Sequence, residues 1–291
     1  MNLRDLQYLV AMADHKHMGR AAASCNVSQP TMSMQLKKLE SWLDVPLFER
    51  RQKMMHLTLY GEALANRARR VVQEADALVI HAKSLRDPLA GEYRMGAFPT
   101  LAPYYLPSVV PALAKAFPKL TLLLVEDKTD RLLTQLKDGT LDAALLALPV
   151  TLPGLVTELL FEEPFPLAVP RSHRLAGAKH VKVADIKNEA VLLLEDGHCM
   201  RSQALEVCGL IGLKEQLGFR ATSLETLRQM VATGVGVTLM PACAAIDSEH
   251  VVHIPFAHTP YTRQIGLVSR ETSPRHVLTE ALAGWLKAQR L

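Results

Sequence analysis

The chain has few cysteines and no long apolar run. Its four cysteines are Cys25, Cys199, Cys208 and Cys243, and no two of them have CxxC spacing. Without that spacing, and without an apolar leader after Met1, the sequence predicts a protein of the reducing cytoplasm with no zinc, no other metal and no cofactor. No stretch reaches the roughly 18 apolar residues that a membrane helix needs, which argues against a membrane protein.

Length and composition indicate a globular protein of more than one domain. The 291 residues exceed one typical domain, and 49% of them are hydrophobic against 21% charged. The charge is unevenly distributed, since residues 1–87 hold 13 Lys and Arg against 9 Asp and Glu, whereas the remainder holds 20 of each. A basic N-terminal third on a neutral body is typical of a nucleic-acid-binding arm.

The first third, residues 1–59, has the element order of a winged helix-turn-helix domain. An amphipathic helix near Leu3–Val10 is followed by a short helix, a tight turn at Cys25–Val27 and a third helix. Ser28 can cap that third helix, and Pro30 occupies its first turn, where a missing N–H costs nothing. A small helical domain with a merely solvated polar face is the alternative.

The polar side of the third helix is the expected DNA-contacting surface. Met32, Leu36 and Leu39 form an apolar stripe, so the hydroxyl, amide and cationic side chains face away from the core. A basic tip on the following hairpin predicts a wing that touches phosphates or the minor groove. The residues expected to contact double-stranded promoter DNA are Ser28, Gln29, Pro30, Thr31, Ser33, Met34, Lys37, Arg50, Arg51 and Lys53.

Residues 60–88 predict a long linker helix that pairs with a second copy of the chain. Its apolar residues are spaced alternately by four and three, which is an a/d seam sustained over three heptads. They are Leu64, Ala68, Val71, Ala75, Leu78, Ala82 and Leu85. A dimer would place two DNA-binding domains at two half-sites. A long helix that packs only on its own domain is the alternative.

The rest of the chain, residues 91–291, predicts a two-lobed α/β regulatory domain of the periplasmic-binding-protein-like kind. Apolar strands at Tyr93–Ala97, Leu120–Val125 and Leu141–Leu148 alternate with helical segments, which is typical of βαβ units in a mostly parallel sheet. The segment Leu120–Val125 is continuously apolar, as expected of a buried parallel strand.

This strand–helix pattern restarts near Glu163, which divides the regulatory domain into two lobes. We place lobe I at residues 91–162 and 268–291 and lobe II at residues 163–267, with a strand near Gln264–Val268 crossing back. Two similar lobes joined by crossing segments make a cleft, in which ligands are expected at the carboxyl ends of the strands.

Cys199 and Cys208 lie in a segment that has no glycine or proline between them. If the segment is helical, nine steps of ~1.5 Å separate the two Cα atoms by roughly 13–14 Å, whereas a disulfide needs about 4.4–6.8 Å. A bond between them would therefore be a redox switch that rebuilds the backbone. His198, Arg201 and a helix beginning near Gly197 favour the thiolate of Cys199. The alternative is that both cysteines are ordinary small hydrophobic residues.

Two parts of the chain resemble a known family. The stretch from Ala21 to Phe48, with Asn-Val-Ser-Gln-Pro-Thr at residues 26–31, resembles the DNA-binding signature of LysR-type transcriptional regulators. The segment Leu194–Cys208, with Leu-Glu-Asp-Gly-His-Cys at its start, and the segment Phe219–Arg228 resemble the redox region of the peroxide-sensing members of that family. The resemblance covers essentially the whole chain.

The resemblance implies a regulator that senses hydrogen peroxide and activates peroxide-scavenging genes. Peroxide would oxidise Cys199 to a sulfenic acid, which Cys208 captures as a disulfide. The implied peroxide pocket consists of Thr100, Thr129, Gly197, His198, Arg201 and Arg263. The implied partners are a second copy through the linker helix, a tetramer, promoter DNA and RNA polymerase.

Two other functions fit parts of this pattern. The same architecture could sense a small metabolite in the inter-lobe cleft, with Cys199 and Cys208 incidental. A thiol peroxidase that turns over at Cys199 is an enzyme alternative, against which the DNA-binding arm argues, so no enzymatic activity is expected. Packing is the expected role of Cys25 and Cys243.

Overall fold

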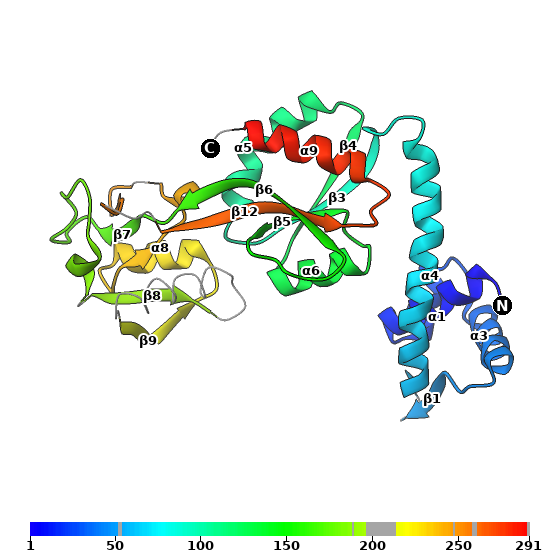
Figure 1. Ribbon diagram of the computed structural model, residues 1–291. Coiled ribbons are helices and arrows are strands. Elements are labelled where there is room, and N and C mark those ends of the chain that lie inside the picture. Colours follow the sequence, from blue (N-terminus) through cyan, green and yellow to red (C-terminus); the bar gives the residue numbers. More distant parts are fainter. Residues whose placement is uncertain (52–53, 188, 196–213, 247, 258–260, 290–291) are drawn as a thin grey trace. The chain divides into compact units, whose positions relative to one another are not determined.

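The computed structural model describes residues 1–51, 54–187, 189–195, 214–246, 248–257 and 261–289 (Figure 1). The chain divides into two compact units, Met1–Arg86 and Asp87–Leu291. No helix in the described ranges is both long enough and apolar enough to cross a lipid bilayer.

The first unit is a helix-turn-helix with a two-stranded wing, as predicted. Its elements are α1 (Leu3–His15), α2 (Met18–Ser24), α3 (Gln29–Leu43), β1 (Phe48–Arg51), β2 (Met54–Leu57) and α4 (Leu59–Ser84). In the turn before α3, Asn26 has φ of 53°, a left-handed conformation that asparagine tolerates better than most residues. The Ser28 side chain accepts a hydrogen bond from the Thr31 N–H, which confirms the predicted cap.

Two close contacts attach the wing to the helices. The Glu40 carboxylate of α3 accepts hydrogen bonds from the N–H groups of Leu47 and Phe48, at 2.8 and 3.1 Å. Gly61 of α4 passes so close to the same segment that a Cβ there would lie 2.1 Å from the Leu47 carbonyl oxygen. These contacts fix the wing against α3 and α4.

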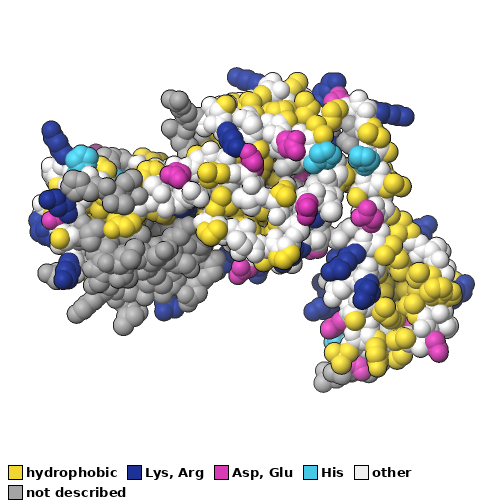
Figure 2. All heavy atoms as spheres, in the orientation of Figure 1, with side chains coloured by type: hydrophobic (Ala, Val, Ile, Leu, Met, Phe, Trp, Pro, Cys, Tyr) yellow, Lys and Arg dark blue, Asp and Glu magenta, His cyan; other side chains and the backbone are white. Residues whose placement is uncertain are grey.

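Helix α4 has two halves with different surroundings. In its first half Ala65 and Ala68 are buried, and Leu64 packs against the same helix-turn-helix core. Farther along, Leu78 is 73% exposed, and Leu85, directly after the end of the helix, is 75% exposed. Figure 2 shows hydrophobic side chains along the surface that α4 forms. The first half therefore belongs to the core of its own unit, whereas the second half presents the predicted seam to solvent.

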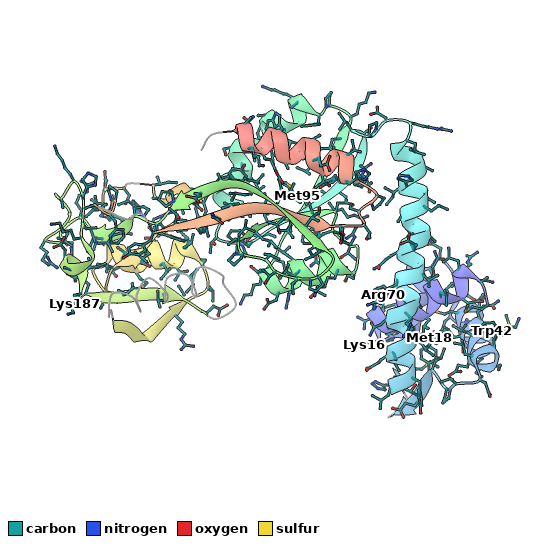
Figure 3. The ribbon with its side chains drawn as sticks, viewed as in Figure 1. Lys16, Met18, Trp42, Arg70, Met95 and Lys187 are labelled. Carbon is teal, nitrogen blue, oxygen red and sulfur yellow. The ribbon has the colours of Figure 1, made fainter. Side chains whose placement is uncertain are left out.

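The second unit contains a five-stranded sheet in the order β4-β3-β5-β12-β6 (Figure 1). Its strands are β3 (Gly91–Ala97), β4 (Leu120–Glu126), β5 (Ala143–Ala147), β6 (Leu155–Pro164) and β12 (Thr262–Arg270). The helices that cover it are α5 (Ala102–Ala116), α6 (Thr129–Lys137) and α9 (His276–Ala288). Met95 of β3 is fully buried in the core that they form (Figure 3).

The connections between the parallel strands explain the layers. Helix α5 leads from β3 to its neighbour β4, and α6 leads back past β3 to β5. Right-handed crossovers in opposite directions place their helices on opposite faces of a sheet. Accordingly α5 and α9 cover one face and α6 covers the other (Figure 1).

Two expectations for this sheet are wrong in part. The segment Leu120–Val125 forms the parallel strand β4, but β4 is an edge strand in which Leu123 and Leu124 are 38% and 43% exposed. Apolarity alone does not distinguish a central strand from an apolar edge. The sheet is also mixed rather than mostly parallel, because β12 returns from the other lobe and runs antiparallel to both of its neighbours.

A second core lies in the part of this unit between Phe165 and Ile254. Its strands are β7 (Leu167–Pro170), β8 (Ala190–Leu194), β9 (Lys214–Ala221), β10 (Thr238–Leu239) and β11 (Val251–Ile254), with helix α8 (Leu224–Ala232). Strands β10-β7-β11 are antiparallel, and β8 pairs with β9 in parallel. Ser223 accepts a hydrogen bond from the Thr226 N–H at the start of α8.

Strands β6 and β12 connect the two cores. They pair antiparallel from Thr262 opposite Pro164 to Arg270 opposite Leu155. The crossing strand expected near Gln264–Val268 is therefore confirmed, and it is longer than predicted. The sequence analysis missed its partner β6 and the last helix α9.

Candidate functional site

The exposed side of α3 is the first candidate site. Of the predicted DNA-contacting residues on this helix and its cap, all are exposed except Ser33, which is half-buried. They border a shallow groove of about 630 Å³ that is lined by Pro30, Ser33, Met34, Lys37, Lys38 and Ser41. The groove offers hydroxyls and two ammonium groups next to a thioether, a mixture suited to phosphates and base edges. Lys38 belongs to the same polar face of the helix as Lys37.

The wing supplies the second part of this surface. Arg50 and Arg51 lie on β1, opposite Met55 and Met54 of β2, so they stand at the predicted hairpin. Their side chains, and Lys53 as a whole, lie outside the described residues.

The predicted redox segment also lies outside the described residues. The segment contains both redox cysteines, Cys199 and Cys208, and three of the expected pocket residues, Gly197, His198 and Arg201. The structure does describe the strand that leads to this segment. Strand β8 ends at Leu194, and the Glu195 N–H donates a hydrogen bond to the Ala221 carbonyl, at 2.8 Å.

Thr100 and Thr129 follow neighbouring parallel strands at the same edge of the sheet. Thr100 comes three residues after the end of β3 and Thr129 three residues after the end of β4. The ends of the two strands are joined, because the N–H of Asp127, directly after β4, donates to the carbonyl of Ala97, the last residue of β3, at 3.3 Å. The Thr129 hydroxyl oxygen is buried and has no hydrogen-bond partner among the described residues. A buried hydroxyl without a partner is unfavourable unless a ligand or another group completes it.

Lys128 joins this edge of the sheet to the end of β8. Its ammonium lies 2.7 Å from the Glu195 carboxylate, with side chains 41% and 37% exposed. Glu195 lies four residues before Cys199, and a carboxylate close to a thiol disfavours its thiolate. The structure pairs that acid with a cation, which reduces its opposition.

Arg263 is fully buried and is bound on two sides. Its Nε donates to the Glu163 carboxylate at 2.6 Å, and both side chains are completely buried. Its Nη1 donates to the Thr100 hydroxyl at 2.9 Å, and its Nη2 to the Thr100 carbonyl at 3.1 Å. The structure therefore brings together two of the predicted pocket residues, Thr100 and Arg263, which are 163 residues apart in the sequence.

Two aromatic rings and one cysteine complete the surroundings of this ion pair. The Arg263 guanidinium carbon lies 5.0 Å from the ring centre of Phe98 and 5.6 Å from that of Phe165. The Cys243 N–H donates to Glu163 at 2.8 Å. Burial raises the pKa of the Cys243 thiol, and the negative charge of Glu163 raises it further. Cys243 is therefore held as a neutral thiol, which suits a packing role.

The sequence analysis did not identify Glu163, Phe98 or Phe165 as site residues. Glu163 and Arg263 lie 100 residues apart, so no local spacing could have indicated the pair. Glu163 also carried no distinctive local signal, because β6 contains two further acids, Glu158 and Glu162, which are exposed. Within the described ranges, no cluster of His, Cys, Asp and Glu side chains could hold a metal ion.

Both units match models of one protein family. A model described as LysR substrate binding domain matches residues 86–290. A model described as bacterial regulatory helix-turn-helix protein, lysR family, matches residues 3–62. Together they span nearly the whole chain.

Individual relatives agree over the same length. The chain is 44% identical over 292 aligned residues to the DNA-binding transcriptional dual regulator OxyR of Escherichia coli K12, covering 99% of this chain and 96% of that protein. A full-length OxyR variant from Pseudomonas aeruginosa superposes with a TM-score of 0.81 at 33% identity, covering 99% and 95% of the two chains. A Corynebacterium glutamicum OxyR mutant, with hydrogen peroxide bound, gives a TM-score of 0.67 at 33% identity, covering 98% and 91%. This chain therefore belongs to the LysR family of bacterial transcriptional regulators and, within it, to the OxyR group.

Proposed function

We propose that this protein is a DNA-binding transcription regulator that senses hydrogen peroxide through Cys199 and activates peroxide-scavenging genes. The observation that carries the proposal is the pair of threonines that follow β3 and β4, at the edge of the sheet that the Lys128–Glu195 ion pair joins to the end of β8. Thr100 follows β3 and Thr129 begins α6 just after the neighbouring strand β4, and the Thr129 hydroxyl is buried without a partner among the described residues. Such hydroxyls suit a small polar ligand such as peroxide. The Corynebacterium glutamicum OxyR structure with hydrogen peroxide bound supplies independent support for this ligand.

The proposed chemistry is a two-step oxidation of thiols. The Cys199 thiolate attacks one oxygen of hydrogen peroxide, the O–O bond breaks, and the other oxygen leaves with the electron pair and takes a proton to form water. Cys199 is then a sulfenic acid. The Cys208 thiolate attacks its sulfur, a second hydroxide leaves as water, and a disulfide results. Two thiols are oxidised and one peroxide is reduced to two waters.

The disulfide would act through the fold of its own segment. If residues 199–208 are helical when reduced, the bond requires that helix to unwind, because its ends are too far apart. A covalent change of this kind biases a two-state element. The change would alter how the regulatory domains pair and hence how two DNA-binding units meet their half-sites.

Further parts of the proposal concern partners and location. The exposed apolar seam on the second half of α4, which includes Leu78 and continues to Leu85 directly after the helix, would pair with the same seam of a second copy. Two such dimers would form a homotetramer that binds promoter DNA and recruits RNA polymerase in the cytoplasm. The protein would consume peroxide only stoichiometrically, so it would not be an enzyme.

Peptide mass mapping tests this function. Alkylated protein is digested before and after one equivalent of hydrogen peroxide, alongside Cys199→Ser and the matched control Cys25→Ser. We expect a reversible Cys199–Cys208 crosslink in the parent protein and in Cys25→Ser, and none in Cys199→Ser. Binding to a random-sequence duplex pool should change with peroxide only where the crosslink forms. Free thiols at both positions after treatment would refute peroxide sensing and direct the search to a small molecule in the cleft.

A further inference from the structure

The Glu163–Arg263 ion pair stands directly behind one of the two threonine hydroxyls. We propose that Glu163 and Arg263 are positioning residues that orient the Thr100 hydroxyl as a hydrogen-bond donor toward the peroxide that reacts with Cys199. This inference rests on the proposed peroxide-sensing function. It assigns a task to a residue, Glu163, that lies on a crossing strand rather than in the predicted pocket.

The ion pair is built into the two strands that connect the lobes. Glu163 of β6 and Arg263 of β12 are directly opposite each other in the strand register. Both side chains are completely buried, and the contact between Nε and the carboxylate is 2.6 Å. Removal of one member of a buried pair leaves an uncompensated charge, so the two residues depend on each other.

The opposite edge of the guanidinium holds Thr100 at two points. Nη1 donates to the hydroxyl and Nη2 to the backbone carbonyl of the same residue. Two contacts to one residue fix both its backbone and its side chain, since a planar guanidinium presents its donors in a rigid fork. Phe98 and Phe165 lie within cation–π distance of Arg263 and help to hold the plane of the fork.

The direction of the Thr100 hydroxyl proton follows from the donor set. An arginine has only N–H donors, so the Thr100 oxygen must accept from it. The single proton of that hydroxyl is then left to donate to another acceptor. Among the described residues, no such acceptor is bonded to the Thr100 hydroxyl. A facing positive charge also makes the hydroxyl a stronger donor toward an oxygen that becomes negative.

Glu163 keeps this arrangement neutral and rigid. One of its oxygens takes the Arg263 Nε–H, and the other accepts the Cys243 N–H at 2.8 Å. Because both of its oxygens are hydrogen-bonded, the carboxylate holds Arg263 in one position. The guanidinium in turn fixes the position of Thr100. Neither Glu163 nor Arg263 needs to touch peroxide.

The step that benefits is the cleavage of the O–O bond. As the thiolate sulfur bonds to one oxygen and loses two electrons, the departing oxygen gains the electron pair and takes up a proton to become water. A hydroxyl that donates to the departing oxygen stabilises its developing charge. Alkylation of the same thiolate by iodoacetamide releases iodide instead and does not need that donor.

The comparison of these two reactions tests the proposal. In Glu163→Gln we expect oxidation of Cys199 by hydrogen peroxide to be about tenfold to a hundredfold slower, while alkylation by iodoacetamide stays within about twofold of the parent protein. Equal slowing of both reactions would mean that Glu163 affects the thiolate itself, and an unchanged oxidation rate would mean that it has no role; either result overturns the inference.

Two controls separate positioning from stability. Glu158→Gln removes an ion pair with Lys287 from the same strand β6 and should leave both rates unchanged. In a Thr100→Val background, Glu163→Gln should slow oxidation no further, because the effect passes through the lost hydroxyl; additive slowing would refute this route.

A second variant and the parent protein complete the design. If Glu163→Gln does not fold, Arg263→Lys keeps the charge but loses the fork, and the same selective slowing is expected. A parent protein that forms no peroxide-dependent crosslink would refute the proposed function itself. A parent protein that reacts while Glu163→Gln reacts equally fast would refute only this inference.

Discussion

Lys128 and Glu195 form an ion pair, with their charged atoms 2.7 Å apart, between the loop before α6 and the residue after β8. The pair connects two segments that are 67 residues apart in the chain. It neutralises an acid four residues before Cys199. It also lies next to Thr129, whose hydroxyl is buried without a partner among the described residues. The edge of the sheet that carries Thr129 is thereby tied to the start of the redox segment.

Loss of the Lys128 charge should slow the reactions of Cys199. Lys128→Gln leaves the Glu195 carboxylate without this cation, which disfavours a nearby thiolate. Because both side chains are more than a third exposed, we expect only about a 1.4- to 5-fold decrease, the size of an exposed ion pair. Stopped-flow alkylation at neutral pH and low salt measures it. Lys119→Gln, which removes an exposed pair with Asp87, is the control. A faster reaction in Lys128→Gln would contradict the prediction.

Replacement of Thr129 by valine should change stability and reactivity in opposite directions. The buried hydroxyl has no partner among the described residues, and an unsatisfied buried polar group costs about 1–3 kcal/mol. Thr129→Val should therefore stabilise the reduced protein by about 1 kcal/mol while it slows oxidation by peroxide. Urea unfolding and peroxide kinetics provide the two measurements.

The control for this prediction lies on the same helix. The Thr134 hydroxyl donates to the Asp130 carbonyl at 2.9 Å, so Thr134→Val removes a satisfied group and should not stabilise the protein. If Thr129→Val lowered stability as well as reactivity, the hydroxyl would have a structural partner and the ligand role would fail.

Two glycine-to-alanine changes should alter the stability of the protein in opposite directions. A Cβ at Gly61 would lie 2.1 Å from the Leu47 carbonyl oxygen, whereas a Cβ at Gly284 of α9 meets nothing within 4 Å. We expect Gly61→Ala to destabilise the DNA-binding unit by more than about 1 kcal/mol and to weaken DNA binding. Gly284→Ala should stabilise α9 by about 0.5–1 kcal/mol. Thermal unfolding of both variants measures the difference, and equal effects would mean that the wing can move away from α4.

A charge on the exposed half of α4 should prevent pairing without unfolding the chain. Leu78 is 73% exposed within one chain, so Leu78→Lys does not bury a charge in the monomer. In a paired seam, however, the same change places two positive charges next to each other, which opposes pairing. Sedimentation equilibrium should show a smaller assembly at an unchanged circular dichroism spectrum. Val235→Lys changes a residue of lobe II that is 41% exposed and serves as the control. An unchanged mass for Leu78→Lys would place self-association elsewhere.

Cys243 should stay unreactive even when peroxide is in excess. Burial and the Glu163 charge raise the pKa of its thiol, so little thiolate forms near neutral pH. The folded chain then retains a proton that the unfolded chain releases, and stability should fall as the pH rises above about 8.5, the ordinary cysteine value. Mass mapping of a Cys199→Ser, Cys208→Ser double variant measures the reactivity of Cys243. Urea unfolding between pH 7 and pH 10 measures the loss of stability. Rapid oxidation of Cys243 would contradict both expectations.

Local patterns in the sequence predicted the elements whose signals lie within a few residues. The Ser28 cap and the tight turn at Cys25–Val27 appear where the sequence places them. Each depends on backbone groups at most three or four positions away, so spacing alone is informative. The apolar seam of α4 was visible for the same reason, although its division into a packed half and an exposed half was not.

Only the tertiary structure decided the features that depend on residues far apart in the chain. Apolarity made Leu120–Val125 a strand but could not place it at the sheet edge, because edge and central strands share that composition. The Glu163–Arg263 pair and its contact with Thr100 join β6 and β12 to the loop after β3, and the Lys128–Glu195 pair joins the loop after β4 to the end of β8. The sequence by itself determined the helix-turn-helix, the strand–helix alternation and the likeness to a redox regulator. The surroundings of Thr100 required the crossing strands, since packing alone brings those residues together.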